Sequence, residues 1–228
     1  MDKLESLLLF FPVLLLSMVA HEYAHGYAAL KQGDATAYQQ GRLTWNPVVH
    51  IDPFWTILLP ALTAMGGGPM FGGAKPIPVT PRNYRNYKRG DIIVSLAGVA
   101  ANFGLAVAAT LIFALLGLIG RAAPGIEPTL ALMQVVMTAG VHINFWLIGF
   151  NLLPIPPLDG SHVFKYLLPP VWAQRYQEYA HYGFFALIVL IYFGRPILDV
   201  WRLPWTIAAA LLLGAVQKLS LAGMGQWQ

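Results

Sequence analysis

Long apolar segments separated by short polar breaks make up most of this chain. Five such segments can be placed, at residues 5–31, 91–120, 129–152, 181–200 and 204–222. Each is close to or above the roughly 20 residues that a helix needs to cross the hydrocarbon core of a bilayer. The pattern therefore predicts an all-α polytopic membrane protein with about five transmembrane helices.

The connection between the first two apolar segments differs from them in composition. Residues 34–45 mix Thr, Tyr and other polar side chains around a Gln-Gln-Gly turn signal, which predicts a small β-hairpin. Residues 54–65 are apolar but number only about a dozen before a Gly-rich run, a length that favours a re-entrant or interfacial segment over a span. We therefore expect a small hairpin and a re-entrant element between the first two transmembrane helices.

Composition supports a membrane environment. Hydrophobic residues make up 57% of the chain and charged residues only 11%, against about a quarter charged in ordinary soluble domains. The chain has no cysteine, so a metal site would have to use His, Asp or Glu. No cleavable signal peptide, internal repeat or soluble appendage is visible, so a single membrane-embedded domain over residues 1–228 is expected.

The first apolar segment contains the sequence His21-Glu22-Tyr23-Ala24-His25. Ionisable side chains are costly at membrane depth, and there they mark functional sites by default. Histidines at i and i+4 project from one helical face, so His21 and His25 can bind one Zn²⁺. Glu22, between them, can contact a water beside the metal without being a ligand. The motif is typical of zinc proteases, and its setting predicts one that works inside the bilayer.

A catalytic zinc site keeps three protein ligands and one open position, so a third ligand is needed. The acidic residues in or beside apolar segments are Asp52, Asp91, Glu127, Asp159 and Asp199. Asp159 stands out because prolines at 154, 156 and 157 forbid a regular helix before it, and Gly160 allows a close backbone approach. Irregular backbone at membrane depth is tolerated where it lines a protein cavity. A simple turn after a span is an equally good interpretation of these residues alone.

Two motifs together resemble the site-2 protease family of intramembrane zinc metalloproteases. They are His21-Glu22-x-x-His25 and Asn151-x-x-Pro154 followed by Asp159-Gly160. Other stretches are also similar to compact bacterial and archaeal members, namely Asn46-Pro47, His50-Ile51-Asp52-Pro53, Gly72-Gly73-Ala74-Lys75-Pro76 and Ala97-Gly98-x-x-x-Asn102. The resemblance covers about residues 15–165. It departs from the family at Gly98-Val99, where Gly-Pro is common, and nothing resembles the PDZ or CBS domains of some members.

The resemblance implies a function and a set of site residues. One Zn²⁺ per chain would be bound by His21, His25 and Asp159, with Glu22 as general base and then general acid in peptide hydrolysis. Asn102 would hold the substrate or polarise its carbonyl group, although an interhelical hydrogen bond is the competing interpretation. The catalytic core would occupy about residues 5–165, with accessory C-terminal helices at about 181–222.

Three further residues are candidates for contact with the substrate. Asn151 could orient part of the site, although a helix-packing amide would look the same. His50 could contact the site or the substrate, but histidines beside prolines usually order a loop. Gly73 belongs to a stretch, 72–79, that together with 34–45 could pair with an extended substrate strand.

Charge indicates the orientation in the membrane. The basic residues Arg82, Arg85, Lys88 and Arg89 alternate with tyrosines just before the second apolar segment. Such a cluster is typical of a cytoplasmic membrane interface. We therefore expect an integral membrane protein with the metal toward the cytoplasm and a cytoplasmic C-terminus. Its compact build favours a prokaryotic plasma membrane.

The expected partners are a transmembrane protein or peptide substrate and the lipid bilayer, while nucleic acid is not expected and the oligomeric state stays open.

Two other functions compete with a protease. A transporter or proton relay would explain buried ionisable groups but not the partner motif at Asp159-Gly160. A non-proteolytic zinc-binding regulator would explain the ligands but not the intact Glu22.

Overall fold

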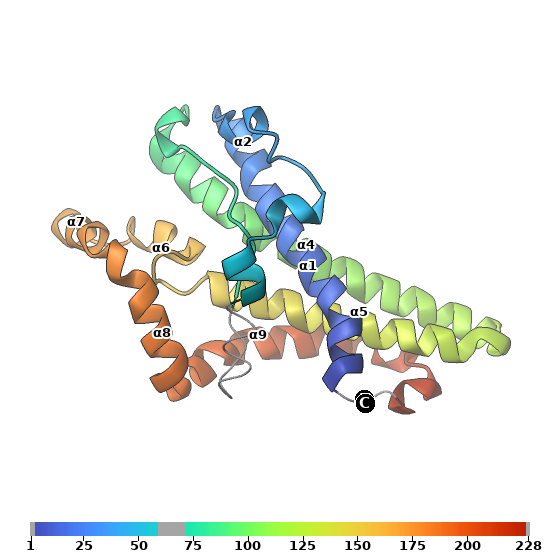
Figure 1. Cartoon of the computed structure of the whole chain (residues 1–228). Coiled ribbons are helices and arrows are strands. Elements are labelled where there is room, and N and C mark those ends of the chain that lie inside the picture. The colour runs from blue at the N-terminus through green and yellow to red at the C-terminus, as the bar shows by residue number, and fades with distance from the viewer. Residues whose placement is uncertain (1–2, 59–71, 227–228) are drawn as a thin grey trace. The chain divides into compact units, whose positions relative to one another are not determined.

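The computed structural model describes residues 3–58 and 72–226, and it is helical, with no strand in those two ranges (Figure 1). The α-helices are α1 (Lys3–Gln32), α2 (Thr36–Gln39), α4 (Tyr87–Ala122), α5 (Glu127–Asn151), α6 (Asp159–Phe164), α7 (Pro170–Glu178), α8 (Gly183–Phe193) and α9 (Arg195–Val216). Short 3-10 or π turns join them, namely η1 (Pro47–His50), η2 (Pro53–Leu58), η3 (Pro81–Asn83), η4 (Pro124–Ile126), η5 (Ala180–Tyr182), η6 (Gln217–Leu219) and η7 (Ala222–Gln226). The predicted all-α class is confirmed.

The helices form two compact units, each assembled from stretches that are distant in sequence. Unit 1 contains Met1–Ser17, Asn102–Ile148 and Arg202–Gln228, whereas unit 2 contains Met18–Ala101 and Gly149–Trp201. Helices α1 and α4 each contribute one part to unit 1 and the other part to unit 2.

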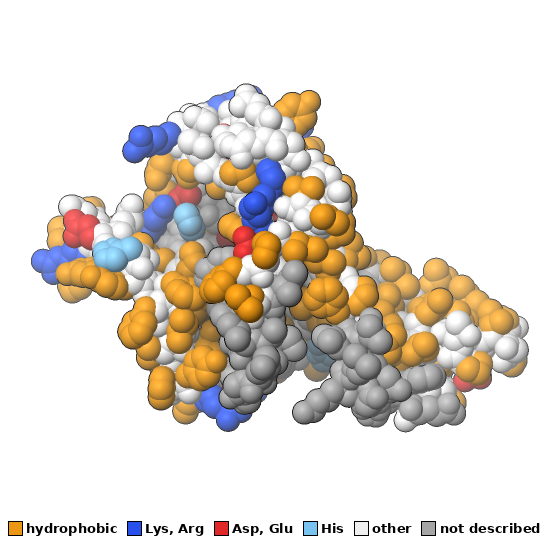
Figure 2. All heavy atoms as spheres, viewed as in Figure 1, with side chains coloured by type: hydrophobic (Ala, Val, Ile, Leu, Met, Phe, Trp, Pro, Cys, Tyr) orange, Lys and Arg blue, Asp and Glu red, His pale blue; other side chains and the backbone are white. Residues whose placement is uncertain are grey.

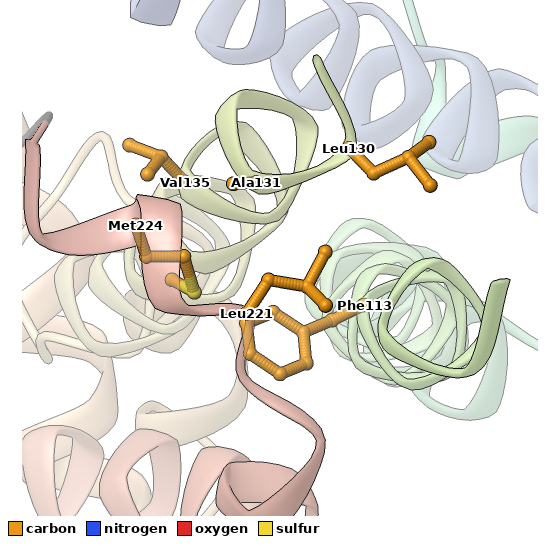
Figure 3. Close-up of a cluster of buried hydrophobic side chains, with 6 residues drawn as sticks. All are labelled: Phe113, Leu130, Ala131, Val135, Leu221 and Met224. Carbon is orange, nitrogen blue, oxygen red and sulfur yellow. The ribbon is translucent and has the colours of Figure 1, made fainter. Parts of the chain in front are cut away.

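Unit 1 is held together by an apolar cluster and by buried amides. Its apolar cluster contains Phe113, Leu130, Ala131, Val135, Leu221 and Met224 (Figure 3). Gln134, which is fully buried on α5, donates from Nε2 to the carbonyl oxygens of Phe113 and Leu219 and accepts from the backbone N–H of Leu221. Both donors and the acceptor of this buried amide are therefore used. The bonds hold α4, α5 and the segment after α9 together.

Three helical stretches within the described ranges are long and apolar enough to cross a membrane. They are Tyr87–Ala122, Pro124–Asn151 and Arg195–Leu219. Much of their apolar surface is exposed, as at Phe103 and Leu111 on α4 and Leu211 on α9, and hydrophobic side chains cover much of the visible face in Figure 2. Exposed apolar surface on this scale suits contact with lipid.

The predicted count of five spans is not supported. The expected fourth span, 181–200, is interrupted because α8 ends at Phe193 and Gly194 separates it from α9. An 11-residue helix extends only about 16 Å, roughly half the thickness of the hydrocarbon core. Among the described residues, α1 is not one of the candidate spans either.

The predicted β-hairpin at residues 34–45 is wrong. Residues Thr36–Gln39 form helix α2 instead. The Asp34 side chain accepts hydrogen bonds from the backbone N–H and the hydroxyl of Thr36, and such local bonds favour a helix start over a strand. Gly41 then adopts a left-handed conformation, with φ of 64°, which ends the turn.

The expected re-entrant segment lies mostly outside the described residues. Its first part, up to Leu58, belongs to η2, and residues 59–65 fall within the range that is not described.

Asp34 also links the end of α1 to a distant loop. It is 1% exposed and accepts further bonds from the backbone N–H of Thr80 and the side-chain amide of Asn83. Burial alone would raise the pKa of this carboxyl group, but the hydrogen bonds from Thr36, Thr80 and Asn83 outweigh it and hold the pKa below its ordinary value.

We expect Asp34→Ala to lower the free energy of unfolding by about 3 kcal/mol, because buried donors lose their acceptor. Since the pKa of Asp34 is lower in the folded chain, its contribution is complete above about pH 4 and is lost as pH falls through the folded value. The difference between wild type and variant should therefore shrink below about pH 4, as measured by denaturant unfolding in mild detergent. A difference that persists unchanged in acid would contradict the role of the charged carboxylate.

Candidate metal centre

Helix α1 places two imidazoles next to each other in unit 2. His21 and His25 are 7% and 8% exposed, and their rings meet edge to face with centroids 4.6 Å apart. Their Nε2 atoms are 3.0 Å from each other. The i, i+4 spacing therefore does what the sequence predicts, because both ring nitrogens converge on one point.

Asp159, the first residue of α6, completes the cluster. Its Oδ2 atom lies 3.1 Å from His21 Nε2 and 3.3 Å from His25 Nε2. Gly160 makes this approach possible, since a Cβ atom there would lie 2.2 Å from the carbonyl oxygen of Leu152. Within residues 3–58 and 72–226, these three side chains form the one group able to hold a metal ion. The structure therefore brings together the three predicted ligands.

Either a cation or an added proton must hold the three converging atoms of this cluster together. His25 Nδ1 lies 2.7 Å from the carbonyl oxygen of Val94. A carbonyl oxygen only accepts, so Nδ1 carries the proton and Nε2 of the neutral ring presents a lone pair. With both rings neutral, at most one proton, on His21 Nε2, can lie among the three converging atoms. Accordingly, Asp159 Oδ2 is buried without a hydrogen-bond partner among the described residues.

The same cluster fits zinc well. Zinc bonds of about 2.0–2.2 Å would put tetrahedral ligand atoms roughly 3.3–3.6 Å apart, close to the distances found among the three atoms. Two imidazoles and one carboxylate are also the ligand types of several catalytic zinc sites, in which a fourth position stays open for water. The Val94 carbonyl would fix the tautomer of His25, a common device around zinc-bound histidines.

Helix α4 packs closely against both imidazoles. A Cβ atom on Gly98 would lie 2.5 Å from His21 Cε1 and 2.6 Å from the Nε2 atoms of His21 and His25. No side chain other than hydrogen fits at this position without moving the rings. Gly98 and Val94 are therefore parts of the site that the sequence did not reveal as such, although Gly98 belongs to a family-like motif.

Glu22 is held by the loop that precedes α4. Its Oε2 atom accepts a 2.7 Å hydrogen bond from the backbone N–H of Ile77. Ile77 is itself buried and lies close to Gly26 of α1. Glu22 is thus fixed beside the cluster without belonging to the ligand set. The Ile77 contact depends on a loop conformation that no sequence pattern indicated.

Asn102 lies in unit 1, outside the unit that holds the cluster. It is fully buried, and its amide donates to Asn144 Oδ1 at 2.7 Å and to the carbonyl oxygen of Ser17 at 3.4 Å. Asn144 in turn donates to Ser17 Oγ. These bonds connect α1, α4 and α5, which is the interhelical arrangement weighed above against a catalytic role.

The three weaker candidates lie in unit 2. His50 is fully buried; its Nε2 atom donates to the carbonyl oxygen of Thr44, and its own carbonyl accepts from the N–H of Lys75. Gly73 accepts from Thr56 Oγ1 through its carbonyl oxygen. Asn151 is half-buried at the end of α5. The contacts of His50 and Gly73 order the loop, and a substrate role for any of the three stays a prediction.

Comparison with known proteins identifies the family. The model of peptidase family M50 matches residues 9–191, which include the whole cluster. The chain is 38% identical to YwhC of Bacillus subtilis over 180 residues, 78% of this chain and 77% of the relative. It is 31% identical to Rip2 of Mycolicibacterium smegmatis over 188 residues, 82% of this chain and 67% of the relative. Both relatives are named "Putative zinc metalloprotease".

A shorter match extends to the archaea. The chain is 41% identical to MJ0611 of Methanocaldococcus jannaschii over 108 residues, 46% of this chain and 49% of the relative, and that protein has the same description. No solved structure matches the chain significantly. The family expected from two short motifs is confirmed. With its apolar, membrane-length helices, the chain is an integral membrane metalloprotease and belongs to peptidase family M50.

Proposed function

We propose that this protein binds one Zn²⁺ per chain through His21, His25 and Asp159 and uses it to hydrolyse peptide bonds within or near transmembrane segments. One observation carries this proposal. Ligand atoms of two imidazoles and one carboxylate converge within 3.3 Å of one another. A bound cation would hold these atoms together, and three protein ligands would leave a position open for chemistry.

Zinc would supply a lowered pKa for the attacking water and polarise the substrate carbonyl group. Glu22 would accept the proton of that water and deliver it to the leaving amine, which is the usual work of a general base and acid. The backbone N–H of Ile77 supports this role because it holds one carboxylate oxygen and leaves the other available.

Asn102 would have to change its hydrogen-bond partners to act on a substrate. Its amide would have to release Asn144 Oδ1 in order to donate to a substrate carbonyl group. We therefore give Asn102 a role in helix packing first, and a role in substrate binding only if the cleavage rate of Asn102→Ala falls more than its stability explains.

The substrate class follows from the membrane setting. A transmembrane helix has its peptide bonds locked in hydrogen bonds, so it must become locally extended before hydrolysis. Residues 72–80 carry no regular secondary structure and lie beside Glu22 through Ile77. Such a segment could pair with an extended substrate strand.

The basic residues from Arg82 to Arg89 support a metal centre toward the cytoplasmic face. The expected cytoplasmic C-terminus loses its basis, because it required residues 181–200 to cross the membrane and α8 is too short to do so.

Metal removal tests the function directly. We expect purified protein in detergent to contain about one zinc per chain and to cleave a model transmembrane peptide. Treatment with a chelator should abolish cleavage, and added zinc should restore it, with the metal content measured by elemental analysis. Protein without zinc would favour a transporter or proton relay. Zinc without cleavage of any transmembrane peptide in a panel would favour a regulator.

A further inference from the structure

Asp91 is a buried carboxylate that the proposed chemistry does not use. It lies in the first turns of α4 and is 3% exposed. A carboxylate is costly to bury unless its oxygens are fully bonded. Within residues 3–58 and 72–226, the bonds of Asp91 come from the end of α6 and the residues after it.

Three side chains bind Asp91. Lys165 Nζ lies 2.6 Å from Oδ2, the Tyr166 hydroxyl donates to Oδ2 at 2.8 Å, and His162 Nδ1 lies 3.2 Å from Oδ1. Lys165 is itself mostly buried, and its ammonium group lies over the rings of Tyr87 and Tyr166. Charge-assisted bonds of this kind are short, directional and strong. Together they fix α6 against the start of α4.

The contacts of Asp91 with His162, Lys165 and Tyr166, called the clamp below, lie close to the metal cluster in sequence and in structure. His162 is three residues after Asp159 on the same short helix. On α4, Asp91, Val94 and Gly98 follow each other at spacings of three and four residues, so they share one face. The Val94 carbonyl oxygen accepts a hydrogen bond from His25 Nδ1, and Gly98 packs against both imidazoles. One face of α4 therefore contacts the histidines and also holds the helix that supplies Asp159.

We propose that Asp91 is a positioning residue for the metal centre: by clamping His162, Lys165 and Tyr166 it holds Asp159 Oδ2 against the Nε2 atoms of His21 and His25. The inference rests on the proposed zinc site and deepens it. Helix α6 has only six residues, and the prolines before Asp159 prevent a continuous helix from α5, so contacts of its own side chains must position it. Groups that orient metal ligands typically contribute 10–100-fold to metal affinity.

The test compares two buried aspartates. Asp91→Asn weakens the clamp while keeping the size of the side chain. Asp34→Asn is the matched control, because Asp34 is also buried in the same unit and accepts its hydrogen bonds from Thr36, Thr80 and Asn83, which lie outside α6. The dissociation constant for zinc is measured by competition with a chelating dye, and the stability of the zinc-free proteins is measured in parallel.

We expect Asp91→Asn to raise the zinc dissociation constant about 10–100-fold and Asp34→Asn to change it less than about 2-fold, although both lower the stability of the zinc-free protein. Equal zinc affinity in wild type and Asp91→Asn would overturn the inference. An equal rise in both variants would also overturn it, because the effect would then be a general loss of structure.

A second variant decides the matter if Asp91→Asn does not fold. Tyr166→Phe removes one hydroxyl group from the clamp, and we expect it to raise the zinc dissociation constant a few-fold, whereas an unchanged constant in this variant would overturn the inference. Failure of the proposed zinc site is distinguishable, since wild-type protein would then contain no zinc, and failure of the proposed proteolysis would appear as zinc-loaded wild-type protein that cleaves no peptide.

Discussion

Glu22→Gln is expected to reduce the rate of peptide cleavage by about 10²–10⁴-fold, the usual contribution of a general base and acid. The variant should keep its zinc, because Glu22 is not among the three side chains that form the cluster. The amide oxygen of Gln can still accept the N–H of Ile77, so the loop should keep its place. The measurements are the rate of cleavage of a transmembrane peptide and the zinc content of the purified protein.

A surface carboxylate provides the matched control. Glu178→Gln makes the same chemical change on an exposed face of α7, where the side chain accepts a hydrogen bond from Gln174. We expect this variant to cleave like wild type. If Glu22→Gln also retained wild-type activity, the proton would have to be carried by another group and the proposed mechanism would be wrong.

Gly98→Ala is expected to weaken zinc binding by about 100-fold, at the upper end of the effects of residues around metal ligands. The added methyl group would lie within 2.6 Å of both Nε2 atoms, a distance that side chains do not tolerate. The imidazoles must move, and the ligand atoms move with them. Competition between the protein and a chelating dye measures the loss.

The same helix offers a control for this substitution. A Cβ atom on Gly104 would meet nothing within 4 Å. Gly104→Ala should therefore leave zinc binding unchanged and stabilise α4 by up to about 1 kcal/mol, because alanine favours a helix. Equal zinc affinity in Gly98→Ala and Gly104→Ala would show that the histidines do not lie against α4 as described.

The three predicted ligands could be found in the sequence because two of them are four residues apart on one helix and the third lies in an unusual Pro-rich segment. His21 and His25 converge through helix geometry alone, and Asp159 was distinguished by the prolines before it and by the partner motif. The groups that hold these ligands could not be predicted. The Val94 carbonyl has no side-chain signature, and the Ile77 N–H reaches Glu22 across 55 positions of sequence.

The errors in the predicted fold have physical causes of the same kind. Residues 34–45 have the composition of a hairpin, but the bonds from Thr36 to Asp34 start a helix. Residues 181–200 are apolar enough for a span, but a hydropathy average does not show that the helix is broken at Gly194. In both cases one residue with a specific local conformation overrides an average over many.

The bond between His25 and the Val94 carbonyl has a consequence for how the protein can change over generations. A side-chain acceptor can be lost or replaced by a single codon change, whereas a backbone carbonyl is present whatever residue stands at position 94. A substitution at position 94 therefore does not remove the group that fixes the tautomer of His25. Selection for weaker or tighter metal binding would have to act elsewhere, for example at Gly98 or at Asp159 and its surroundings.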